Sequence, residues 1–342
     1  MERKDFSFET IRIPAGEQIS RRLLDFWGGI FGQDYLANQN TVSILSGKEK
    51  KLNRDIVLAA KYKNSIVSTV HLTVSLFDSR IGGIGEVATV TEHREKGLAK
   101  ILCQKAIKEF EKMGGKWLFL GTSNPVAARM YHSLGWRYIT GSRVMFRNSE
   151  GQSPEIFFAE YFRYIKNHKI RIVRGDTRFR LQIIPAAVIP YEGPLLDLNA
   201  GLFSTRWFIQ QLCMGLYPRY ESIDRDGAWF VALSGKFIAG ISSVKFHEDY
   251  AQIDGFCPSE MGEKILFNLF HAAIEYALRN KTREIHMVSD VLDAKKKKFL
   301  LKMGCVPVNE KMKIESKEGL IDISVYKFPL KENYAEKIRK IF

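Results

Sequence analysis

Arg94-Glu95-Lys96-Gly97-Leu98-Ala99-Lys100 joins a predicted strand over 84–90 to a predicted helix over 98–113. Apolar residues in the helical segment recur at the i, i+3, i+4 spacing, and Gly114-Gly115 ends it. Glycine at position 97 lets a ligand approach the backbone closely, and the first N–H groups of a helix are unpaired and carry a partial positive charge. The turn therefore predicts a cradle for a pyrophosphate group, although a plain strand-to-helix turn would use the same residues.

A second segment, Asn124-Pro125-Val126-Ala127-Ala128-Arg129-Met130-Tyr131-His132-Ser133-Leu134-Gly135-Trp136, follows a short buried strand over 117–120. Asparagine before proline is a typical helix start, and the glycine is a typical helix end. Tyr131 lies on the apolar face of this helix, because the apolar residues follow the i, i+3, i+4, i+7 spacing. Taken by itself, Tyr131 is therefore as well explained as a core residue.

Local signals divide the rest of the first half into short elements. We expect a strand over 6–13, a helix over 17–31, and two strands over 55–76 joined at the turn Lys63-Asn64. Gly82-Gly83 is expected to interrupt the chain before the strand over 84–90, and 136–146 is expected to form one strand. This order of strands and helices predicts a mixed α/β sheet.

The chain of 342 residues is long enough for about two domains. The polar stretch Asn148–Pro154 predicts the boundary, so we expect domains over 1–148 and 149–342. In the second half, a hairpin over 228–246, a helix over 263–278 and a strand and helix over 284–303 repeat the order of the first half. The matched spacings predict a duplicated fold.

The composition is that of a globular protein, with 45% hydrophobic residues and no apolar run long enough to span a membrane. The N-terminus carries no secretory signal. The cysteines lie far apart and give neither a metal-binding spacing nor a disulfide framework: Cys103, Cys213, Cys257 and Cys305. A cytoplasmic location and a protein without a metal are predicted.

The net charge of +14 invites a nucleic acid or an anionic membrane as partner. The excess of basic residues is spread along the chain, however, and its densest run is only Lys295-Lys296-Lys297-Lys298. We expect this run to be a solvated helix face. The charge pattern therefore predicts neither nucleic acid nor a membrane as partner.

Together, Arg94-x-x-Gly97-x-Ala99 and Asn124-Pro-x-Ala127-x-x-x-Tyr131-x-x-Leu134-Gly135-Trp136 resemble the motifs of the GNAT N-acetyltransferase superfamily, over about residues 7–147. The resemblance implies a mixed, mostly antiparallel central sheet flanked by helices, with acetyl-CoA as co-substrate. It implies that the pantetheine arm contacts Asn124 and lies between two parallel strands, along Val87, Ala88 and Thr89 on one of them. It also implies a set of residues that wrap the pyrophosphate, mostly through backbone N–H groups: Arg94, Glu95, Lys96, Gly97, Leu98, Ala99 and Lys100.

The resemblance further implies that Tyr131 is the general acid that protonates the departing CoA thiolate. A neutral phenol with a pKa of about 10 can donate to a thiolate whose conjugate acid has a pKa of about 8.5. A backbone N–H group near Ala88 or Thr89 would polarise the acetyl carbonyl.

Family members use a glutamate or a water chain as general base, and Glu86 is the candidate here. The alternative for Glu86 is a strand residue that faces solvent or an arginine. Phe119 stands where some members carry a glutamate, so that position offers no base. His93 and the terminal carboxylate of Phe342 are weaker alternatives.

The second half resembles a degenerate copy of the first. Aligned on Gly304, Asp293 takes the position of the motif asparagine and Leu300 that of the motif tyrosine, and leucine cannot donate a proton. Glu260 and Glu263 near the start of its main helix would repel a pyrophosphate. We therefore predict two GNAT-like domains, of which the first is catalytic.

The predicted activity is acetyl-CoA-dependent N-acetylation of a small-molecule or peptide amine, by direct transfer in a ternary complex, by a monomer or homodimer. The alternative is a non-catalytic CoA-sensing or nucleic-acid-binding protein on the same scaffold. The sequence does not identify the amine, but Trp27, Phe31 and Tyr35 are candidates for the walls of the acceptor pocket.

Overall fold

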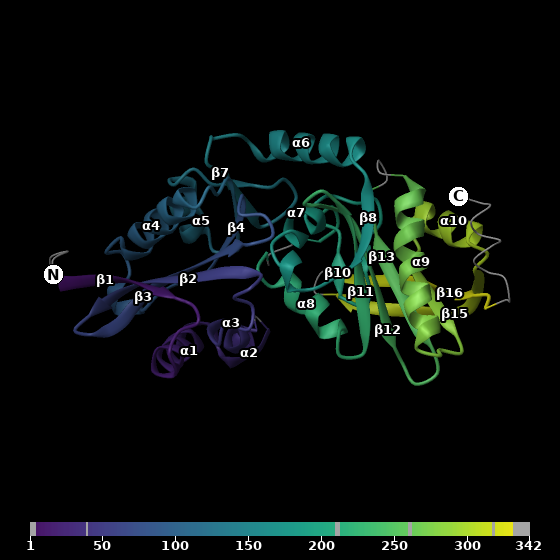
Figure 1. Cartoon of the computed structure of the whole chain (residues 1–342), viewed down its shortest axis with the longest axis horizontal. Coiled ribbons are helices and arrows are strands. Elements are labelled where there is room, and N and C mark those ends of the chain that lie inside the picture. The colour runs from purple at the N-terminus through teal and green to yellow at the C-terminus, as the bar shows by residue number, and fades with distance from the viewer. Residues whose placement is uncertain (1–4, 39, 209–212, 259–261, 317–318, 331–342) are drawn as a thin grey trace. The chain divides into compact units, whose positions relative to one another are not determined.

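Two seven-stranded sheets follow one another along the chain in the computed structural model, which describes residues 5–38, 40–208, 213–258, 262–316 and 319–330 (Figure 1). They lie in two compact units. The first contains Met1–Phe158 together with Thr177–Ile184 and Gln211–Pro218, and the second contains the remainder of the chain. Two short segments of the second half thus complete the first unit.

The first sheet has the strand order β1-β2-β3-β4-β5-β7-β6. All neighbours are antiparallel except β4 and β5, which run parallel. Lys63 and Asn64, both with positive φ, form the tight turn between β2 and β3 that the sequence predicts. The strands are β1 (Phe6–Arg12), β2 (Asn53–Tyr62), β3 (Ser65–Ser75), β4 (Ile81–Thr89), β5 (Trp117–Gly121), β6 (Arg137–Tyr138) and β7 (Val144–Asn148).

Helices cover both faces of this sheet (Figure 1). On one face, α4 (Leu98–Lys112) packs against alternate residues of β2 and β3, and α5 (Pro125–His132) contributes to the same core. On the other face lie α1 (Glu17–Phe31), α2 (Gln33–Asn38) and α3 (Thr41–Leu45). Alternation along the strands supplies an apolar side chain to each core in turn, so both helical layers are held by burial of apolar surface.

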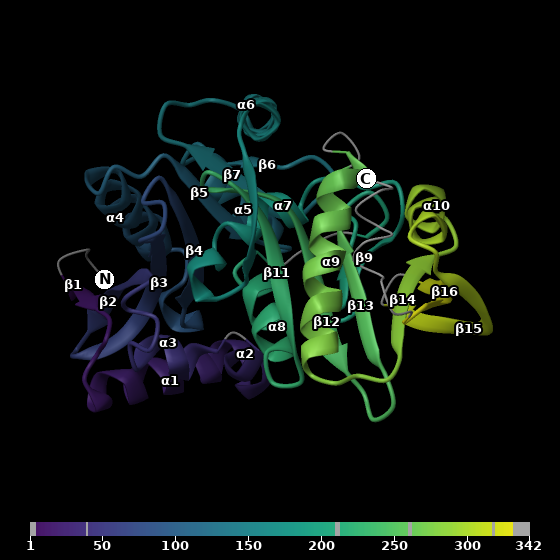
Figure 2. The ribbon, with the colours of Figure 1, turned by 45° about the vertical axis from the view of Figure 1, so that its right-hand side comes forward.

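The second sheet repeats the topology of the first. Its order is β8-β11-β12-β13-β14-β16-β15, and among its described strands only β13 and β14 pair in parallel. The strands are β8 (Ile170–Arg174), β11 (Gly227–Ser234), β12 (Phe237–Phe246), β13 (Ala251–Phe256), β14 (Ile285–Asp290), β15 (Val306–Ser316) and β16 (Gly319–Phe328). Helix α9 (Glu263–Arg279) runs along β11, β12 and β13, and α10 (Ala294–Lys302) follows β14 (Figure 2). The predicted duplication and fold class are confirmed.

The remaining elements connect or flank the two sheets. They are α6 (Pro154–Asn167), α7 (Ile183–Ala187), α8 (Leu216–Ile223), a two-stranded sheet of β9 (Leu195–Asp197) and β10 (Leu202–Phe203), and two short 3₁₀ turns at Thr91–His93 and Thr177–Phe179.

Two local predictions were wrong. Gly82 and Gly83 continue β4 rather than interrupting it, because a large side chain packs where theirs would be: a Cβ added to Gly82 would lie 2.7 Å from Cε2 of Phe110. The segment predicted as one strand over 136–146 forms β6 and β7, which pair with each other through a tight connection.

Candidate active site

The parallel strands β4 and β5 part within the first sheet. They pair from Ile81 to Gly83 on one strand and from Trp117 to Phe119 on the other, and the described ladder goes no further. The register of β4 against β3 shifts between Thr69 and His71, a β-bulge that bends a strand away from its neighbour. The backbone beyond the bulge, including Val87, Ala88 and Thr89, therefore lies past the last described pair of β4 with β5.

The turn from β4 into α4 presents the N-terminus of that helix. Gly97 adopts the left-handed conformation with φ 77°, and no acidic residue occupies the first turn of α4. Arg94 and Lys96 fold back on the turn: Arg94 Nε donates to the Thr89 carbonyl at 3.1 Å, and Lys96 Nζ donates to the Glu92 carbonyl at 2.8 Å. Free N–H groups, a positive helix end and two cations fit the diphosphate of CoA.

Asn124 begins α5 as the sequence predicts. Its Oδ1 accepts hydrogen bonds from the backbone N–H groups of Val126 at 2.9 Å and Ala127 at 3.3 Å, and Pro125 occupies the first helical turn. The side-chain oxygen of Asn124 is thus committed to the helix cap. Contact with a pantetheine arm falls to its amide nitrogen and stays a prediction.

Tyr131, the predicted acid, is buried on α5 with its ring 6.2 Å from that of Trp136. Among the described residues, its hydroxyl has no hydrogen-bond partner. Burial raises the pKa of Tyr131 well above the ordinary value, and the nearby thiols of Cys103 and Cys213 raise it further. The phenol is therefore neutral and carries its proton at physiological pH.

Glu86, the predicted base, does not face solvent. Only 7% of its surface is exposed, and its backbone has φ 44° at the bulge in β4. Its Oε2 lies 2.6 Å from His71 Nδ1, and its Oε1 accepts a 3.0 Å hydrogen bond from Tyr35 Oη. Burial acts to raise the pKa of Glu86, but the hydrogen bond and charge of His71 outweigh it and hold the pKa below its usual range.

The hydrogen bonds continue from His71 to Asp55 on β2. His71 Nε2 lies 2.9 Å from Asp55 Oδ1, which also accepts a 2.7 Å hydrogen bond from Thr73 Oγ1. With a carboxylate at each ring nitrogen, the imidazole is doubly protonated. Burial acts to lower the pKa of His71, but hydrogen bonds to Asp55 and Glu86 raise it to about 9.

Sequence reasoning missed Asp55 and His71. A signal for them exists in β3, where Thr69, His71 and Thr73 place polar side chains at positions that alternate with Val70, Leu72 and Val74. The period of two puts all three on the face covered by α1–α3. Their partners come from other strands, so the spacing of residues in the sequence does not reveal the pairing.

The predicted acid and the predicted base share a neighbour. The thiol of Cys213 acts electrostatically on Tyr131, on Tyr35 and on Glu86. The segment that carries Cys213 belongs to the first compact unit, and Met214 beside it packs on Gly83 and Gly85 of β4. The predicted acid Tyr131 and the predicted base Glu86 therefore both lie near Cys213, within the first compact unit.

The aromatic residues expected around an acceptor pocket divide into two groups. Trp27 is fully buried and donates from Nε1 to Thr69 Oγ1 at 2.9 Å, so its assignment to a pocket wall is wrong and it belongs to the core. Phe31 and Tyr35 are half-buried and in ring contact, with centroids 4.7 Å apart. They remain candidates for the pocket wall.

The second unit has counterparts of the motif asparagine and the motif tyrosine. Asp293 caps α10 by accepting from the Lys296 N–H at 2.8 Å, and Leu300 is fully buried where the first unit has its tyrosine. Glu263 lies in the first turn of α9 and pairs with Lys302 at 2.7 Å, whereas Glu260 lies outside the described residues. The predicted correspondence between the halves is confirmed at α10.

The ends of β13 and β14 are tied together by the second unit's own chain. The Leu198 N–H donates to Asp254 of β13 at 2.7 Å, and the Leu195 N–H donates to Asp290 of β14 at 3.3 Å. Lys296 reaches in from α10 and forms a buried ion pair with Asp254. The prediction that the lysine run is wholly solvated is therefore wrong for Lys296. These contacts lie at the ends of β13 and β14, beyond the last pair of their parallel ladder.

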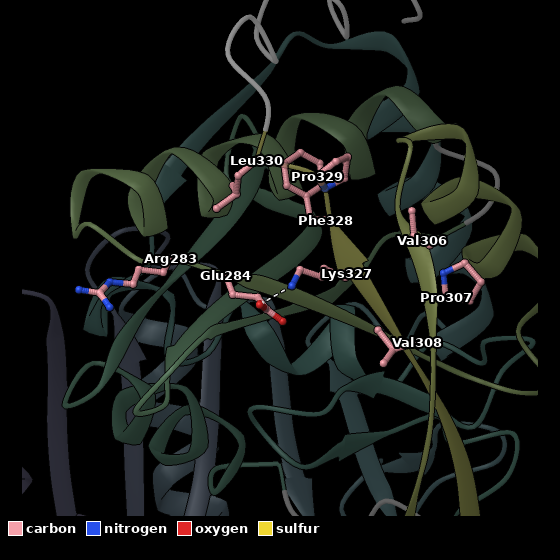
Figure 3. A pocket seen from close by; sticks show the side chains of 9 residues that line it. All are labelled: Arg283, Glu284, Val306, Pro307, Val308, Lys327, Phe328, Pro329 and Leu330. Atoms are coloured by element: carbon pink, nitrogen blue, oxygen red, sulfur yellow. Dashed lines mark hydrogen bonds and ion pairs between the residues drawn. The ribbon is translucent and has the colours of Figure 1, made fainter.

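A hollow of about 550 Å³ lies elsewhere in the second unit (Figure 3). Its walls are mainly aliphatic and proline side chains, and its Glu284 and Lys327 pair with each other rather than pointing at a common ligand position. None of the motif residues lines it. Its lining residues are Arg283, Glu284, Val306, Pro307, Val308, Lys327, Phe328, Pro329 and Leu330.

Within the described part of the chain, no three His, Cys, Asp or Glu side chains are grouped as ligands for one metal ion. Asp55, His71 and Glu86 form a line instead, with the imidazole between the carboxylates. In the same residues, no helix is both long enough and apolar enough to cross a membrane.

Comparison with known proteins follows the same division of the chain. Residues 23–136 match the model of the acetyltransferase (GNAT) family. No curated protein matches the chain.

Three solved structures illustrate the similarity. A GNAT-family acetyltransferase from Staphylococcus aureus Mu50 is 17% identical, with 42% of this chain and 99% of that chain covered and a TM-score of 0.32. YncA of Salmonella typhimurium, solved with acetyl-CoA, is 13% identical, with coverages of 48% and 95% and a TM-score of 0.37. A GCN5-related N-acetyltransferase from Kribbella flavida is 10% identical, with coverages of 95% and 72% and a TM-score of 0.38.

The family match includes both sequence motifs and the strands that part between them. The repeated sheet topology extends the same architecture to the second unit. The N-terminal region of this tandem chain, residues 23–136, therefore belongs to the GNAT acetyltransferase family.

Proposed function

We propose that the chain is an acetyl-CoA-dependent N-acetyltransferase that transfers the acetyl group directly to a primary amine in a ternary complex. The observation that carries the proposal is the parting of β4 and β5 beyond Gly83 and Phe119, next to the exposed N-terminus of α4. Such an opening accepts an extended arm between two strands, while the helix end accepts its diphosphate.

The binding roles follow the order of the site along β4 and α4. Val87, Ala88 and Thr89 line the arm, and a backbone N–H of this strand polarises the acetyl carbonyl. Asn124 contacts the arm from the start of α5. The turn from Arg94 to Lys100, through Glu95, Lys96, Gly97, Leu98 and Ala99, holds the diphosphate.

Tyr131 is the proposed acid. Its neutral hydroxyl, which has no hydrogen-bond partner in the described part of the chain, protonates the thiolate as the carbon–sulfur bond breaks. The thiols near the site are poor nucleophiles, because burial raises the pKa of both Cys103 and Cys213 to about 12. This favours direct transfer over a covalent acyl-enzyme.

The acceptor is a small-molecule or peptide amine, and the half-buried ring pair of Phe31 and Tyr35 is the proposed part of its pocket wall. A cytoplasmic location and a monomeric or homodimeric state stay predictions of the sequence. Nucleic acid is not part of the proposed activity.

Release of CoA thiol from acetyl-CoA across a panel of primary amines tests the function. The Tyr131→Phe variant is expected to lose about 10²-fold or more in kcat, since it lacks the donated proton, and to bind acetyl-CoA as tightly as the wild type in calorimetry. Tyr164→Phe, at a half-buried tyrosine stacked on His168, is the matched control. Equal turnover by Tyr131→Phe would remove this residue from the acid role.

Failure of the wild type to bind acetyl-CoA at millimolar concentration would refute the function itself. Salt-sensitive binding of RNA or DNA in that case would favour the non-catalytic alternative.

A further inference from the structure

We propose that Tyr35 receives the proton released by the acceptor amine and passes its own proton to Glu86, which His71 and Asp55 hold in position. The inference rests on the proposed acetyl transfer and adds its proton-accepting side. It makes Tyr35 a catalytic residue, because its hydroxyl would touch the amine. His71 and Asp55 are positioning residues.

Tyr35, Glu86, His71 and Asp55, here called the relay, form an unbroken chain of hydrogen bonds. Tyr35 Oη donates to Glu86 Oε1 at 3.0 Å, Glu86 Oε2 lies 2.6 Å from His71 Nδ1, and His71 Nε2 lies 2.9 Å from Asp55. Helix α2 supplies Tyr35, and three neighbouring strands supply the others. Every distance is within the range for hydrogen-bonded proton transfer.

Exposure gives the relay a direction. Asp55, His71 and Glu86 are 4%, 2% and 7% exposed, whereas Tyr35 is half-buried and lies at the outer end. Both oxygens of Glu86 are engaged, one by His71 and one by Tyr35. An amine therefore reaches the phenol before it reaches the carboxylate, and the phenol can accept one proton only by giving up its own.

The position matches the proposed acid. Cys213 lies within electrostatic range of Tyr35, Glu86 and Tyr131. Glu86 also precedes Ala88 and Thr89 by two and three residues on β4, the strand along which the acetyl group is proposed to lie. The proton acceptor and the proton donor thus flank the same part of the first unit.

The charges around Glu86 allow it to accept one proton. His71 faces it from β3, Tyr35 from α2 and Asp55 through His71 from β2. The Arg180 guanidinium acts on both Asp55 and Glu86 and is neutralised by Glu49 at 2.5 Å. With His71 protonated, the line Asp55–His71–Glu86 carries one net negative charge, which a proton on Glu86 cancels.

The proposed acetyl transfer conserves its atoms and protons. The neutral amine forms the C–N bond to the acetyl carbon, which makes its nitrogen acidic enough for a carboxylate of low pKa to serve as the final acceptor. One proton passes from nitrogen to Tyr35 Oη while the phenol proton passes to Glu86 Oε1. The C–S bond breaks and the thiolate takes the proton of Tyr131. Exchange with solvent then restores Glu86 and Tyr131.

The test compares acceptors of different basicity. Tyr35→Phe removes one hydroxyl from a half-buried ring, and Glu86→Gln removes the charge. Both variants are expected to lose about 10²-fold in kcat with simple alkylamines, and progressively less as the acceptor becomes less basic, down to nearly wild-type rates with methoxyamine. Tyr164→Phe and Glu150→Gln, the latter at an exposed ion pair with Lys116, are the matched controls.

Loss of the same factor with alkylamines and methoxyamine, or no loss with either, would overturn the relay while acetyl transfer by the wild type stood. Absence of transfer to any amine by the wild type would instead refute the proposed function, and the relay with it. Circular dichroism and acetyl-CoA calorimetry on each variant separate loss of proton transfer from loss of fold or co-substrate.

His71→Asn gives a second, independent readout. Its imidazolium lowers the pKa of Glu86, so its removal is expected to move the acidic limb of the pH–kcat profile to higher pH. A purely structural role for His71 would reduce the rate by one factor at every pH and leave that limb in place, which would overturn the positioning role.

Discussion

At the scale of single residues, the first unit is distinguished by an imidazole buried between two carboxylates. Asp55 and Glu86 come from strands on either side of the one that carries His71, and each accepts one N–H of its ring. Removal of either partner would leave a buried charge without compensation, which is costly. The arrangement therefore ties the protonation of His71 to the stability of the folded chain.

The stability of the protein is expected to fall as the pH rises from neutral to about 10. The pKa of His71 is raised from its ordinary value near 6.5 to about 9, so the stabilisation by its proton is complete below the ordinary value and is lost as pH passes through about 9. At about 1.4 kcal/mol per pKa unit, a shift from 6.5 to about 9 corresponds to a loss of roughly 3–4 kcal/mol.

Urea unfolding at several pH values measures this loss. The His71→Asn variant is expected to lack the His71 contribution to the slope, whereas His132→Asn, at an exposed histidine, retains it. Parallel pH dependences in the wild type and His71→Asn would contradict the assignment of the buried imidazolium.

Sequence reasoning reached Glu86 and Tyr131 but not the partners of Glu86. The motif around Gly97 and Tyr131 is local, because its residues lie within two short turns and their helices. Pairing of His71 with Asp55 and Glu86 depends on the register of three strands, which local spacing does not specify. Likewise, nothing in the run of four lysines marks Lys296 as the one that turns inward to an aspartate on another strand.

At the scale of elements, α4 connects the fold to the proposed binding of the co-substrate. Its start at Leu98 was predicted from periodicity, and its end at Lys112 lies one residue from the prediction. The left-handed residue before it, Gly97, serves the turn and leaves the backbone N–H groups accessible. The same helix also has a left-handed glycine beyond its other end, Gly114, with φ 80°.

This symmetry gives a matched pair of variants. Gly97→Ala and Gly114→Ala each place a Cβ on a left-handed backbone, at a cost of about 1 kcal/mol in stability. Only Gly97→Ala is expected to weaken acetyl-CoA binding, by about tenfold or more, because its methyl group stands at the proposed diphosphate site. Calorimetric titration with acetyl-CoA measures both, and equal affinities in the two variants would contradict the assignment of this turn.

At the scale of the whole molecule, two sheets of one topology differ in what fills the end of their parallel pair. The parallel ladder stops after three pairs in each unit, but in the second unit Leu195, Leu198 and Lys296 bind the carboxylates at the ends of β13 and β14. The sequence predicts the duplication from spacing and the loss of function from Leu300. It does not predict the contacts of Leu195, Leu198 and Lys296, because these join residues far apart in the sequence.

One acetyl-CoA is therefore expected to bind per chain. Calorimetry of the full chain should give a stoichiometry near one, since the second unit has committed the corresponding strand ends to its own backbone. A second binding event of comparable affinity would contradict this account of the second unit.

The short segment Thr177–Ile184 has a consequence for dissecting the protein into fragments. Arg180 of this segment neutralises Glu49, and both side chains are buried in the first unit. A fragment that stops at residue 148 would leave the Glu49 carboxylate enclosed without its cation, a defect of about 3–5 kcal/mol. Expression of residues 1–148 by themselves thus discards a piece of the first unit's own interior, and a fragment meant to represent this unit must include the segment around Arg180.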